Sequence, residues 1–417
     1  MGSNVKDMSL APQGALNIEW AEMQMGGLLR LKASLEKSKP FKGIRVGMCL
    51  HITKETAVLV NTLRAAGADV SITGCNPLST QDDVAAALAK DGVDVYGWRA
   101  ETNDEYYECL NKVLDTKPQY TVDDGCDLVT IVHTERQDLL DGIFAGAEET
   151  TTGVIRLRAM EKEGVLKYPM VAVNDSDTKH LMDNFIGTGQ STIDGILRAS
   201  NVLVASKNVV IAGYGSCGKG VSKRAAGLGA NVTVTEVNPF RALQASMDGW
   251  RVMPMTLAAP TADMIITVTG CKDVVTERHF PLLKDGAILA NSGHFDSEVN
   301  VKALGSAAKS MRRIRPDFDE YSMPDGRRVF VCGEGRLVNL AAAEGHPSTI
   351  MAMSFMDQTF ALKWALENRD KLENKVYVLP EELDMKVARL QLESMKVDID
   401  VLTPEQDAYL NSWQEGT

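Results

Sequence analysis

The sequence lacks the features that mark membrane, secreted and nucleic-acid-binding proteins. None of its 417 residues belongs to an apolar run of the roughly 18 residues that a membrane helix needs. The N-terminal segment has no basic start followed by an apolar stretch, so the sequence predicts no signal peptide. The 44 Lys and Arg are outnumbered by 56 Asp and Glu, a net charge of −12. This deficit of positive charge disfavours nucleic acid or an anionic membrane as a partner.

Cysteine and histidine are also sparse. The few cysteines limit disulfide and zinc sites, and the few histidines limit the candidates for proton transfer. The seven cysteines are odd in number and never form a CxxC pair, which disfavours a disulfide scaffold or a zinc ribbon. We therefore predict reduced thiols, a cytoplasmic location and no metal site. Only six histidines are available to an enzyme that moves protons. Three lie next to predicted strand or helix ends: His51, His294 and His346. We interpret the other three as structural or surface residues: His133, His180 and His279.

What the sequence does contain is a long alternation of short apolar strands and helical patterns. The first series predicts strands at 43–50, 68–73, 93–98, 120–123 and 168–173, and helices at 55–66, 82–90 and 104–114. After a long helix at 191–205, the second series predicts strands at 207–212, 231–235, 263–268 and 286–291, and a helix at 348–366. This alternation is typical of parallel sheets with helices on both faces. The predicted fold is α/β, with two doubly wound, Rossmann-like domains.

The length and the lack of any low-complexity linker indicate how these domains share the chain. A chain of 417 residues predicts two or three domains. We predict a discontinuous first domain, residues 1–185 and 346–385, with a second domain over 186–345 inserted into it. Residues 386–417 form a short C-terminal tail.

A glycine-rich loop opens the second domain. Residues 212–218 contain the pattern GxGxxG between an apolar strand and a helix, and Glu236 lies 21 residues beyond Gly215. In this pattern Gly213 makes a tight turn, Gly215 admits a pyrophosphate, and Gly218 lets the helix pack on the strand. The acid favours NAD over NADP, although Arg241 could soften that preference. The alternative is a turn in a doubly wound sheet that binds no ligand.

Polar clusters follow four predicted strands of the first domain, at 51–55, 123–127, 148–153 and 174–179. Ligands of an open parallel sheet bind outside the carboxyl ends of its strands, so we expect the four clusters on one rim. Taken singly, each could be a helix cap or a solvated loop. A fifth cluster, 291–296, follows a strand of the second domain. It would turn His294 toward the nicotinamide end of a dinucleotide, unless His294 is a loop residue bonded to backbone.

Together these segments resemble the S-adenosyl-L-homocysteine hydrolase family along nearly the whole chain. The matching motifs are HITKE (51–55), NPLSTQD (76–82), DDGCDL (123–128), EETTTG (148–153), NDSDTK (174–179) with 183–184, GYGSCGKG (213–220), NSGHFD (291–296), and EGRLVNL (334–340) with GHP (345–347). The resemblance implies a substrate-binding first domain, an NAD-binding second domain, and an oligomerisation tail in a homotetramer built as a dimer of dimers.

The implied reaction is the reversible hydrolysis of S-adenosyl-L-homocysteine to adenosine and L-homocysteine with tightly bound NAD. Oxidation of the ribose 3′-hydroxyl acidifies the C4′ proton, homocysteine is eliminated, water adds, and the ketone is reduced again. Three alternatives stay open: the same chemistry on S-inosyl-L-homocysteine, an inactive NAD-binding regulatory homologue, and a plain 2-hydroxyacid dehydrogenase.

The resemblance also implies roles for individual residues. Lys179, with a lowered pKa beside the nicotinamide, and Asp183 would act at the 3′-hydroxyl, and Asp124 at the C4′ proton. His51 and His294 would be the acid/base pair at C5′. Glu149, the remaining catalytic residue, would bind the ribose hydroxyls. The substrate-binding residues are Thr53, Glu55, Asn184, His346 and Met351. The cofactor-binding residues are Thr150, Thr151, Thr152, Asn184, Gly213, Gly215, Ser216, Cys217, Gly218, Glu236, Arg241, Ser292, Gly293 and Asn339.

The sequence departs from many relatives at several of these places. Thr188 stands where a cysteine is common, and Ser216-Cys217 replaces Asp-Val in the glycine loop. Arg241 stands where an asparagine often meets the adenosine ribose, and Glu344 where a methionine often faces the base. The chain stops before a longer tail whose lysine and tyrosine complete the neighbouring subunit's NAD site in many relatives. This shorter form resembles the archaeal and thermophilic-bacterial branch.

Overall fold

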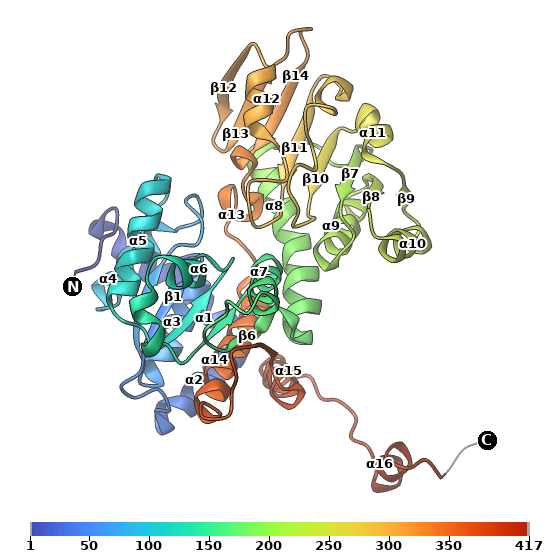
Figure 1. Cartoon of the computed structure of the whole chain (residues 1–417). Helices are drawn as coiled ribbons and strands as arrows, with labels where there is room; N and C mark the ends of the chain where they lie inside the picture. The colour runs from blue at the N-terminus through green and yellow to red at the C-terminus, as the bar shows by residue number, and fades with distance from the viewer. Residues whose placement is uncertain (1, 415–417) are drawn as a thin grey trace.

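The first lobe is built on a seven-stranded sheet in which all neighbouring strands are parallel. The computed structural model describes residues 2–414 and separates them into two lobes (Figure 1). The strand order is β15-β6-β5-β4-β1-β2-β3. The strands are β1 (Arg45–Cys49), β2 (Asp69–Thr73), β3 (Asp94–Tyr96), β4 (Tyr120–Asp123), β5 (Ala145–Glu148), β6 (Met170–Ala172) and β15 (Val376–Val378). The five predicted strands are confirmed as β1, β2, β3, β4 and β6, with ends that differ by at most two residues, whereas β5 and β15 were not among the predicted ranges.

Helices cover both faces of this sheet. The predicted ones are confirmed as α3 (Lys54–Ala65), α4 (Asp82–Lys90), α5 (Asn103–Asp115) and α14 (Ser348–Glu367). The others in this lobe are α1 (Ala11–Gln24), α2 (Gly26–Ser38), α6 (Asp127–Thr134), α7 (Thr151–Lys162) and α15 (Glu381–Met395). Phe355, Met356 and Phe360 of α14 belong to the apolar core of this lobe.

The chain's last part therefore completes the first lobe. Strand β15 pairs with β6, and α14 packs in the core, so this lobe is built from two separate stretches of the chain. The predicted boundary between residues 385 and 386 falls inside α15, which runs without a break to Met395.

The second lobe holds an eight-stranded sheet in the order β12-β13-β14-β11-β10-β7-β8-β9. Its strands are β7 (Asn208–Ala212), β8 (Asn231–Thr235), β9 (Arg251–Val252), β10 (Met264–Thr267), β11 (Ala287–Asn291), β12 (Ser310–Arg315), β13 (Phe318–Ser322) and β14 (Arg328–Cys332). The core strands are parallel as predicted, but β12 and β13 form an antiparallel edge that the sequence analysis did not predict. The helices are α9 (Ser216–Gly227), α10 (Pro239–Met247), α11 (Met255–Ala258), α12 (Val301–Ala307) and α13 (Val338–Ala341).

Two segments connect the lobes. The first is a ten-residue π-helix, η4 (Thr178–Gly187), that continues directly into α8 (Thr188–Ser200). Helix α8 starts three residues before the predicted helix and ends five residues before it, at Ser200. Its C-cap is Asn201, whose φ of +53° places it in the left-handed region. The second segment runs from α13 to the start of α14. Single-turn 3-10 segments are η1 (Met8–Leu10), η3 (Val173–Asp175), η5 (Ala259–Thr261), η6 (Phe280–Leu282) and η7 (Gly333–Gly335), and η2 (Gln137–Gly142) is longer.

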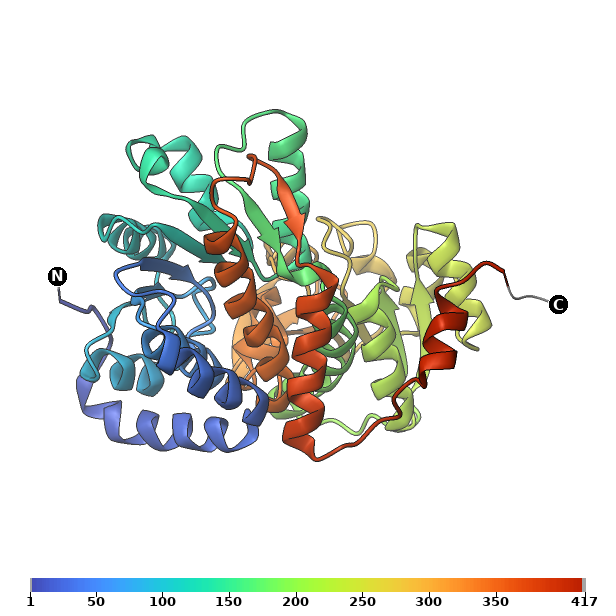
Figure 2. The same cartoon turned by 90° about the horizontal axis from the view of Figure 1, so that it is seen from below.

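The C-terminal arm follows α15 and leaves the body of the protein. It carries a short helix, α16 (Pro404–Leu410), that lies apart from both sheets (Figure 1) and on the side of the second lobe (Figure 2). The described part of this arm contains no buried residue. Within residues 2–414, no helix is long and apolar enough to cross a membrane.

Candidate active site

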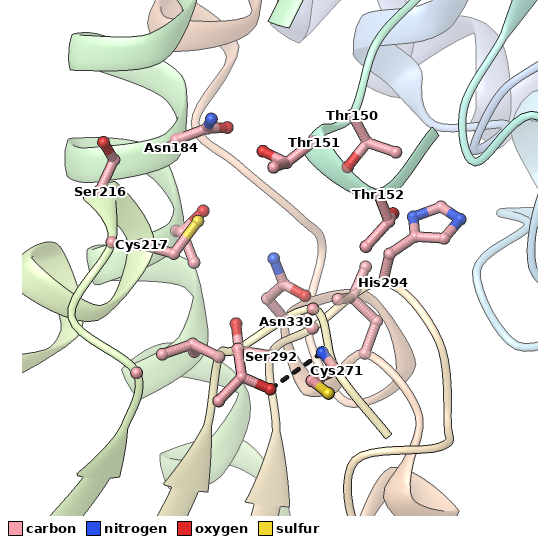
Figure 3. A pocket seen from close by; sticks show the side chains of 18 of the residues that line it. Thr150, Thr151, Thr152, Asn184, Ser216, Cys217, Cys271, Ser292, His294 and Asn339 are labelled. Atoms are coloured by element: carbon pink, nitrogen blue, oxygen red, sulfur yellow. Dashed lines mark hydrogen bonds between the residues drawn. The ribbon is translucent and has the colours of Figure 1, made fainter. Parts of the chain in front are cut away.

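The polar clusters of the first lobe meet on one rim, as predicted. They follow β1, β4, β5 and β6, which are consecutive neighbours in the sheet. This rim faces the second lobe across a cavity of about 1070 Å³ that both lobes line. Every predicted site residue except Gly218 lines the cavity. Figure 3 shows residues of both lobes around this space, with Thr150, Thr151 and Thr152 on one side and Ser216, Cys217 and Ser292 on the other.

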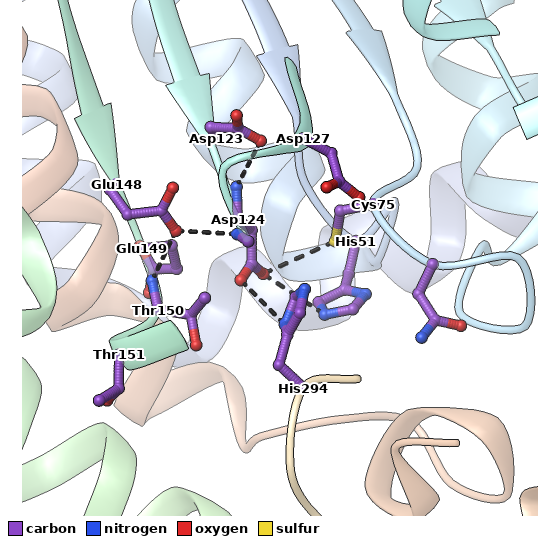
Figure 4. Close-up of polar contacts among 12 residues, drawn as sticks. His51, Cys75, Asp123, Asp124, Asp127, Glu148, Glu149, Thr150, Thr151 and His294 are labelled. Atoms are coloured by element: carbon purple, nitrogen blue, oxygen red, sulfur yellow. Dashed lines mark hydrogen bonds and ion pairs between the residues drawn. The ribbon is translucent and has the colours of Figure 1, made fainter. Parts of the chain in front are cut away.

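Asp124 lies between two histidines that come from different lobes (Figure 4). Its Oδ2 is 3.4 Å from Nε2 of His51, and its Oδ1 is 3.4 Å from Nδ1 of His294. The neighbouring Gly125 permits this approach, because a Cβ there would lie 2.4 Å from Nε2 of His294. The close packing of His294 on the first lobe thus depends on the absence of a side chain at position 125.

His51 is held as a neutral imidazole. Burial lowers its pKa to about 4, although the Asp124 carboxylate opposes the shift. Its Nδ1 lies 2.7 Å from the hydroxyl of Ser79. A neutral imidazole next to a carboxylate can accept a proton from water at physiological pH.

A second cluster surrounds Lys179 on helix η4. Its Nζ donates to Oδ1 of Asp183 (2.9 Å) and to Oδ1 of Asn184 (2.8 Å), and it lies 3.7 Å from Oε1 of Glu149. Lys179 and Asp183 are four residues apart, as on an α-helix face, whereas the wider π turn brings Asn184 to the same ammonium group. This cluster unites three of the predicted catalytic residues.

The charges in this cluster correct one expectation. Burial lowers the pKa of Lys179, but the carboxylates of Asp183 and Glu149 outweigh it, so the net shift is upward rather than downward. For Asp183, burial acts to raise the pKa, but the charges of Lys179 and His346 outweigh burial, so the net shift of the Asp183 pKa is downward. For Glu149 the balance is reversed, because burial outweighs the charge of Lys179 and raises the pKa of Glu149 to about 8. The prediction of a lowered lysine pKa considered only desolvation and the nicotinamide, and it omitted the two acids.

Helix α14 holds this cluster from the opposite side. The hydroxyl of Ser354 donates to Asp183 (2.9 Å), and Nε2 of Gln358 donates to Glu149 (2.5 Å). Nδ1 of His346, just before α14, lies 3.3 Å from Asp183. His346, a predicted substrate-binding residue, therefore lies beside the Lys179 cluster.

The start of α3 carries two of the predicted substrate-binding residues, Thr53 and Glu55. Thr53 is the N-cap of this helix, and Glu55 is 2% exposed and accepts a hydrogen bond from Ser348 (2.6 Å). Lys54 contacts both Glu55 (3.3 Å) and Glu344 (3.0 Å). Glu344 and Met351 line the same cavity.

The glycine loop has the geometry that a dinucleotide requires. Gly213 has a φ of +103°, and a Cβ on Gly218 would lie 2.1 Å from the carbonyl oxygen of Gly213. Helix α9 begins at Ser216, so its free N–H groups point into the loop. The Glu236 carboxylate follows β8 and accepts from the backbone N–H groups of 214, 237 and 238.

The residues around this loop fit NAD. Glu236 lines the cavity where a ribose would follow the pyrophosphate, which is the predicted arrangement. Further along the cavity, Oγ1 of Thr152 and Oδ1 of Asn339 are buried without a hydrogen-bond partner among residues 2–414. Both atoms can accept a hydrogen bond from an N–H group, such as that of a nicotinamide carboxamide. Arg241 also lines the cavity, and it lies close to the glycine loop: its Nη1 would be 3.8 Å from a Cβ added at Gly215.

The sequence analysis missed some residues of this site. His180 was interpreted as structural or surface, yet it lines the cavity, and its Nε2 lies 2.7 Å from the hydroxyl of Ser216 in the glycine loop. Its position directly after Lys179 was the available signal. His133 and His279 are structural as predicted, since each bonds to backbone. The sequence offered no reason to select three further residues, Ser348, Ser354 and Gln358. Each donates a hydrogen bond to an acid of the site that only folding brings near.

Taken together, a phosphate-binding glycine loop in one lobe faces buried acids, histidines and a lysine in the other. This fold and site define a two-lobed, NAD-dependent enzyme. Residues 2–145 match the family S-adenosyl-L-homocysteine hydrolase, and residues 184–345 match the S-adenosyl-L-homocysteine hydrolase, NAD binding domain. The chain belongs to the S-adenosyl-L-homocysteine hydrolase family.

Similar proteins carry two different names. The chain is 55% identical over 415 residues to the S-inosyl-L-homocysteine hydrolase of Methanococcus maripaludis, with 100% of both chains covered. It is 54% identical to the adenosylhomocysteinase of Sulfurisphaera tokodaii, again with 100% of both covered. The solved dipicolinate synthase A chain of Bacillus subtilis is a distant likeness, with 12% identity and a TM-score of 0.46 over 78% of this chain and 98% of that chain.

Proposed function

We propose that the protein catalyses the reversible hydrolysis of S-adenosyl-L-homocysteine to adenosine and L-homocysteine. The observation that carries this proposal is the presence of two proton-transfer clusters, around Lys179 and around Asp124, in one cavity with an NAD loop. Bound NAD⁺ would supply reversible oxidation of the ribose 3′-hydroxyl to a ketone. A ketone at C3′ acidifies the C4′ proton, and this makes elimination of the thioether feasible.

The Lys179 cluster serves the 3′-hydroxyl in this proposal. Lys179 must be neutral before it can take a proton from the substrate. The proton of the pair then resides on Glu149, 3.7 Å away, because burial raises the pKa of this carboxyl to about 8. Asp183 and Asn184 fix the amine in place. The pair Lys179–Glu149 thus exchanges one proton as the hydroxyl is oxidised and restored.

The Asp124 cluster serves C4′ and C5′. Asp124 is the carboxylate that takes the C4′ proton, with a histidine on each side. His51, neutral at physiological pH, takes the proton of the water that adds at C5′. His294, brought in by the second lobe, lies on the other side of Asp124 and is the remaining proton donor for the departing sulfur.

Product formation tests this proposal directly. The purified protein is incubated with homocysteine plus adenosine or inosine, and the condensed thioether is followed by mass spectrometry. Formation of S-adenosyl-L-homocysteine supports the proposal. Absence of product from both nucleosides, with NAD bound, would refute it.

One observation favours a second candidate, the same chemistry on S-inosyl-L-homocysteine. Hypoxanthine presents an acceptor at O6 and a donor at N1, and Lys54 and Glu55 place a cation and a carboxylate 3.3 Å apart beside the cavity. The similar enzymes from Methanococcus maripaludis and Methanocaldococcus jannaschii are named S-inosyl-L-homocysteine hydrolases. The ratio of the inosine and adenosine rates in the same assay decides between the bases.

We also infer which part of the chain binds substrate, which binds NAD and which contacts other subunits. The first lobe (1–185 and 346–385) binds substrate, the inserted lobe (186–345) binds NAD, and the arm within 386–417 joins subunits of a homotetramer. The arm supports this inference because its apolar residues are exposed, for example Val401 (87%) and Trp413 (90%). A cytoplasmic location would fit the seven cysteines, none of which forms a disulfide. Light scattering of the purified protein tests the tetramer.

A further inference from the structure

Two carboxyl groups meet at the start of the helix that carries Lys179. Oδ2 of Asp357, on α14, lies 2.9 Å from the hydroxyl oxygen of Thr178, and the same hydroxyl contacts Oδ1 of Asp384, on α15. Asp357 is 0% exposed, and its Oδ1 has no hydrogen-bond partner within residues 2–414. Neither acid lines the cavity, so neither can touch the substrate.

The number of hydrogens available decides how these groups bond. The hydroxyl of Thr178 carries one hydrogen and can donate to only one carboxyl group. Asp384 already acts as an acceptor, since it receives the backbone N–H groups of Asp177 (2.6 Å) and Thr178 (3.2 Å). If the Thr178 hydroxyl also donates to Asp384, the contact with Asp357 needs a hydrogen from Asp357 itself.

The surroundings of Asp357 agree with this arrangement. Burial, and then the charges of Asp384 and Glu149, raise the pKa of the Asp357 carboxyl, while Thr178 and the more distant Lys179 oppose them. A charged Asp357 would place two buried carboxylates on one hydroxyl, and a buried charge without a close cation is strongly unfavourable.

We propose that Asp357 is a protonated acid that positions Lys179. Its O–H donates to Thr178, and the Thr178 hydroxyl donates to the Asp384 carboxylate, which caps the first turn of η4. Helix α14 then holds the catalytic groups from three nearby positions, because Ser354 and Gln358 bind Asp183 and Glu149. The effect on turnover rests on the proposed function, whereas the protonation of Asp357 does not.

An infrared spectrum tests the protonation. At neutral pH both proteins should show the C=O stretching absorbance of buried carboxylic acids, since Glu149 has a pKa of about 8. The wild-type protein should show an additional band that Asp357→Asn lacks. Glu367→Gln is the matched control, since Glu367 is an exposed acid on the same helix whose loss should leave the band in place. Absence of an Asp357-dependent band overturns the proposal, whether or not the protein proves to be a hydrolase.

Kinetics test the positioning. Asp357→Asn keeps a donor to Thr178, so its kcat should stay within a few-fold of wild type. Asp357→Ala loses the donor and should lower kcat by about tenfold or more with little change in KM, because small displacements of a reacting group are costly. Thr178→Val, which removes the hydroxyl but keeps the shape, should behave like Asp357→Ala and serves if that variant fails to fold. An Asp357→Asn variant as slow as Asp357→Ala, with normal NAD content, overturns the positioning role.

Discussion

The two lobes line the cavity with different kinds of chemical group. The first lobe uses side chains, with Asp124, Glu149 and Lys179 all less than 10% exposed. The second lobe uses mainly backbone, namely the glycine turn, the start of α9 and the N–H groups that hold Glu236. Charge that must change during a reaction has to lie on titratable side chains, whereas a phosphate can be bound by fixed dipoles. Mutations in the two lobes should therefore have separable effects on chemistry and on cofactor retention.

The largest effect is expected from removing the amine in the first lobe. Lys179→Ala should lower the rate by roughly a thousandfold, within the range for loss of a general acid or base, while bound NAD stays near wild type. The measurement is NADH absorbance after nucleoside is added, together with NAD content of the purified protein. Lys162→Ala, an exposed lysine of α7, is the control and should behave like wild type. NADH formation by Lys179→Ala would remove Lys179 from the oxidation step.

The complementary change in the second lobe is Gly218→Ala. The new Cβ would lie 2.1 Å from a backbone oxygen, which cannot move without opening the glycine turn. We expect most of the bound NAD to be lost, and activity to fall with it. NAD released from denatured protein is measured by chromatography. Gly227→Ala lies on the same helix with open space around its Cβ, and it should keep its NAD. Equal NAD content in both variants would contradict the proposed loop function.

A smaller effect should follow where the lobes touch. In Gly125→Ala the new Cβ would displace His294, so kcat should fall by about tenfold to a hundredfold, as for other misplaced catalytic groups. NAD content should not change. Gly142→Ala, which has no atom near its Cβ, is the control. If Gly125→Ala keeps full activity, His294 has no role in the chemistry.

The smallest effect concerns stability and pH. The pKa of His51 is lowered to about 4 in the folded protein, from an ordinary value of 6.5, so between these values the unfolded chain binds the proton more readily. The contribution of His51 to folding is thus fully present above pH 6.5 and is lost as the pH falls toward 4. His51→Asn should weaken the pH dependence of the urea midpoint between pH 7 and 5. An unchanged dependence would show that the His51 pKa is not lowered.

Much of the site could be predicted because strand ends in a parallel sheet converge. Glu149 and Asp124 follow strands β5 and β4, whose places on the rim come from the βα alternation. The glycine loop could be predicted equally well, because its geometry depends on residues that are close together in the sequence. The hairpin strands β12 and β13 could not be predicted in this way. Strand β12 is exposed along its whole length, and β13 is buried but carries the acids Asp319 and Glu320 in its centre, so neither has an apolar strand pattern.

Other features depend on contacts distant in sequence. The pKa of Lys179 reflects Glu149, thirty residues earlier, and the position of η4 reflects Asp384, about two hundred residues later. The π-helical form of η4 has no local signature in the sequence. The support from Ser354 and Gln358 similarly exists only once α14 is packed against the site.

The return of the chain to the first lobe has a consequence for biosynthesis. The second lobe is continuous and leaves the ribosome complete, while the first sheet still lacks β15 and the core helix α14. Until residue 378 emerges, the edge of β6 stays open, and an open strand edge can pair with foreign chains. A nascent chain arrested before Ser348 should therefore hold a folded second lobe beside a first lobe that cannot close its core. The nascent protein thus completes its second lobe before its first lobe.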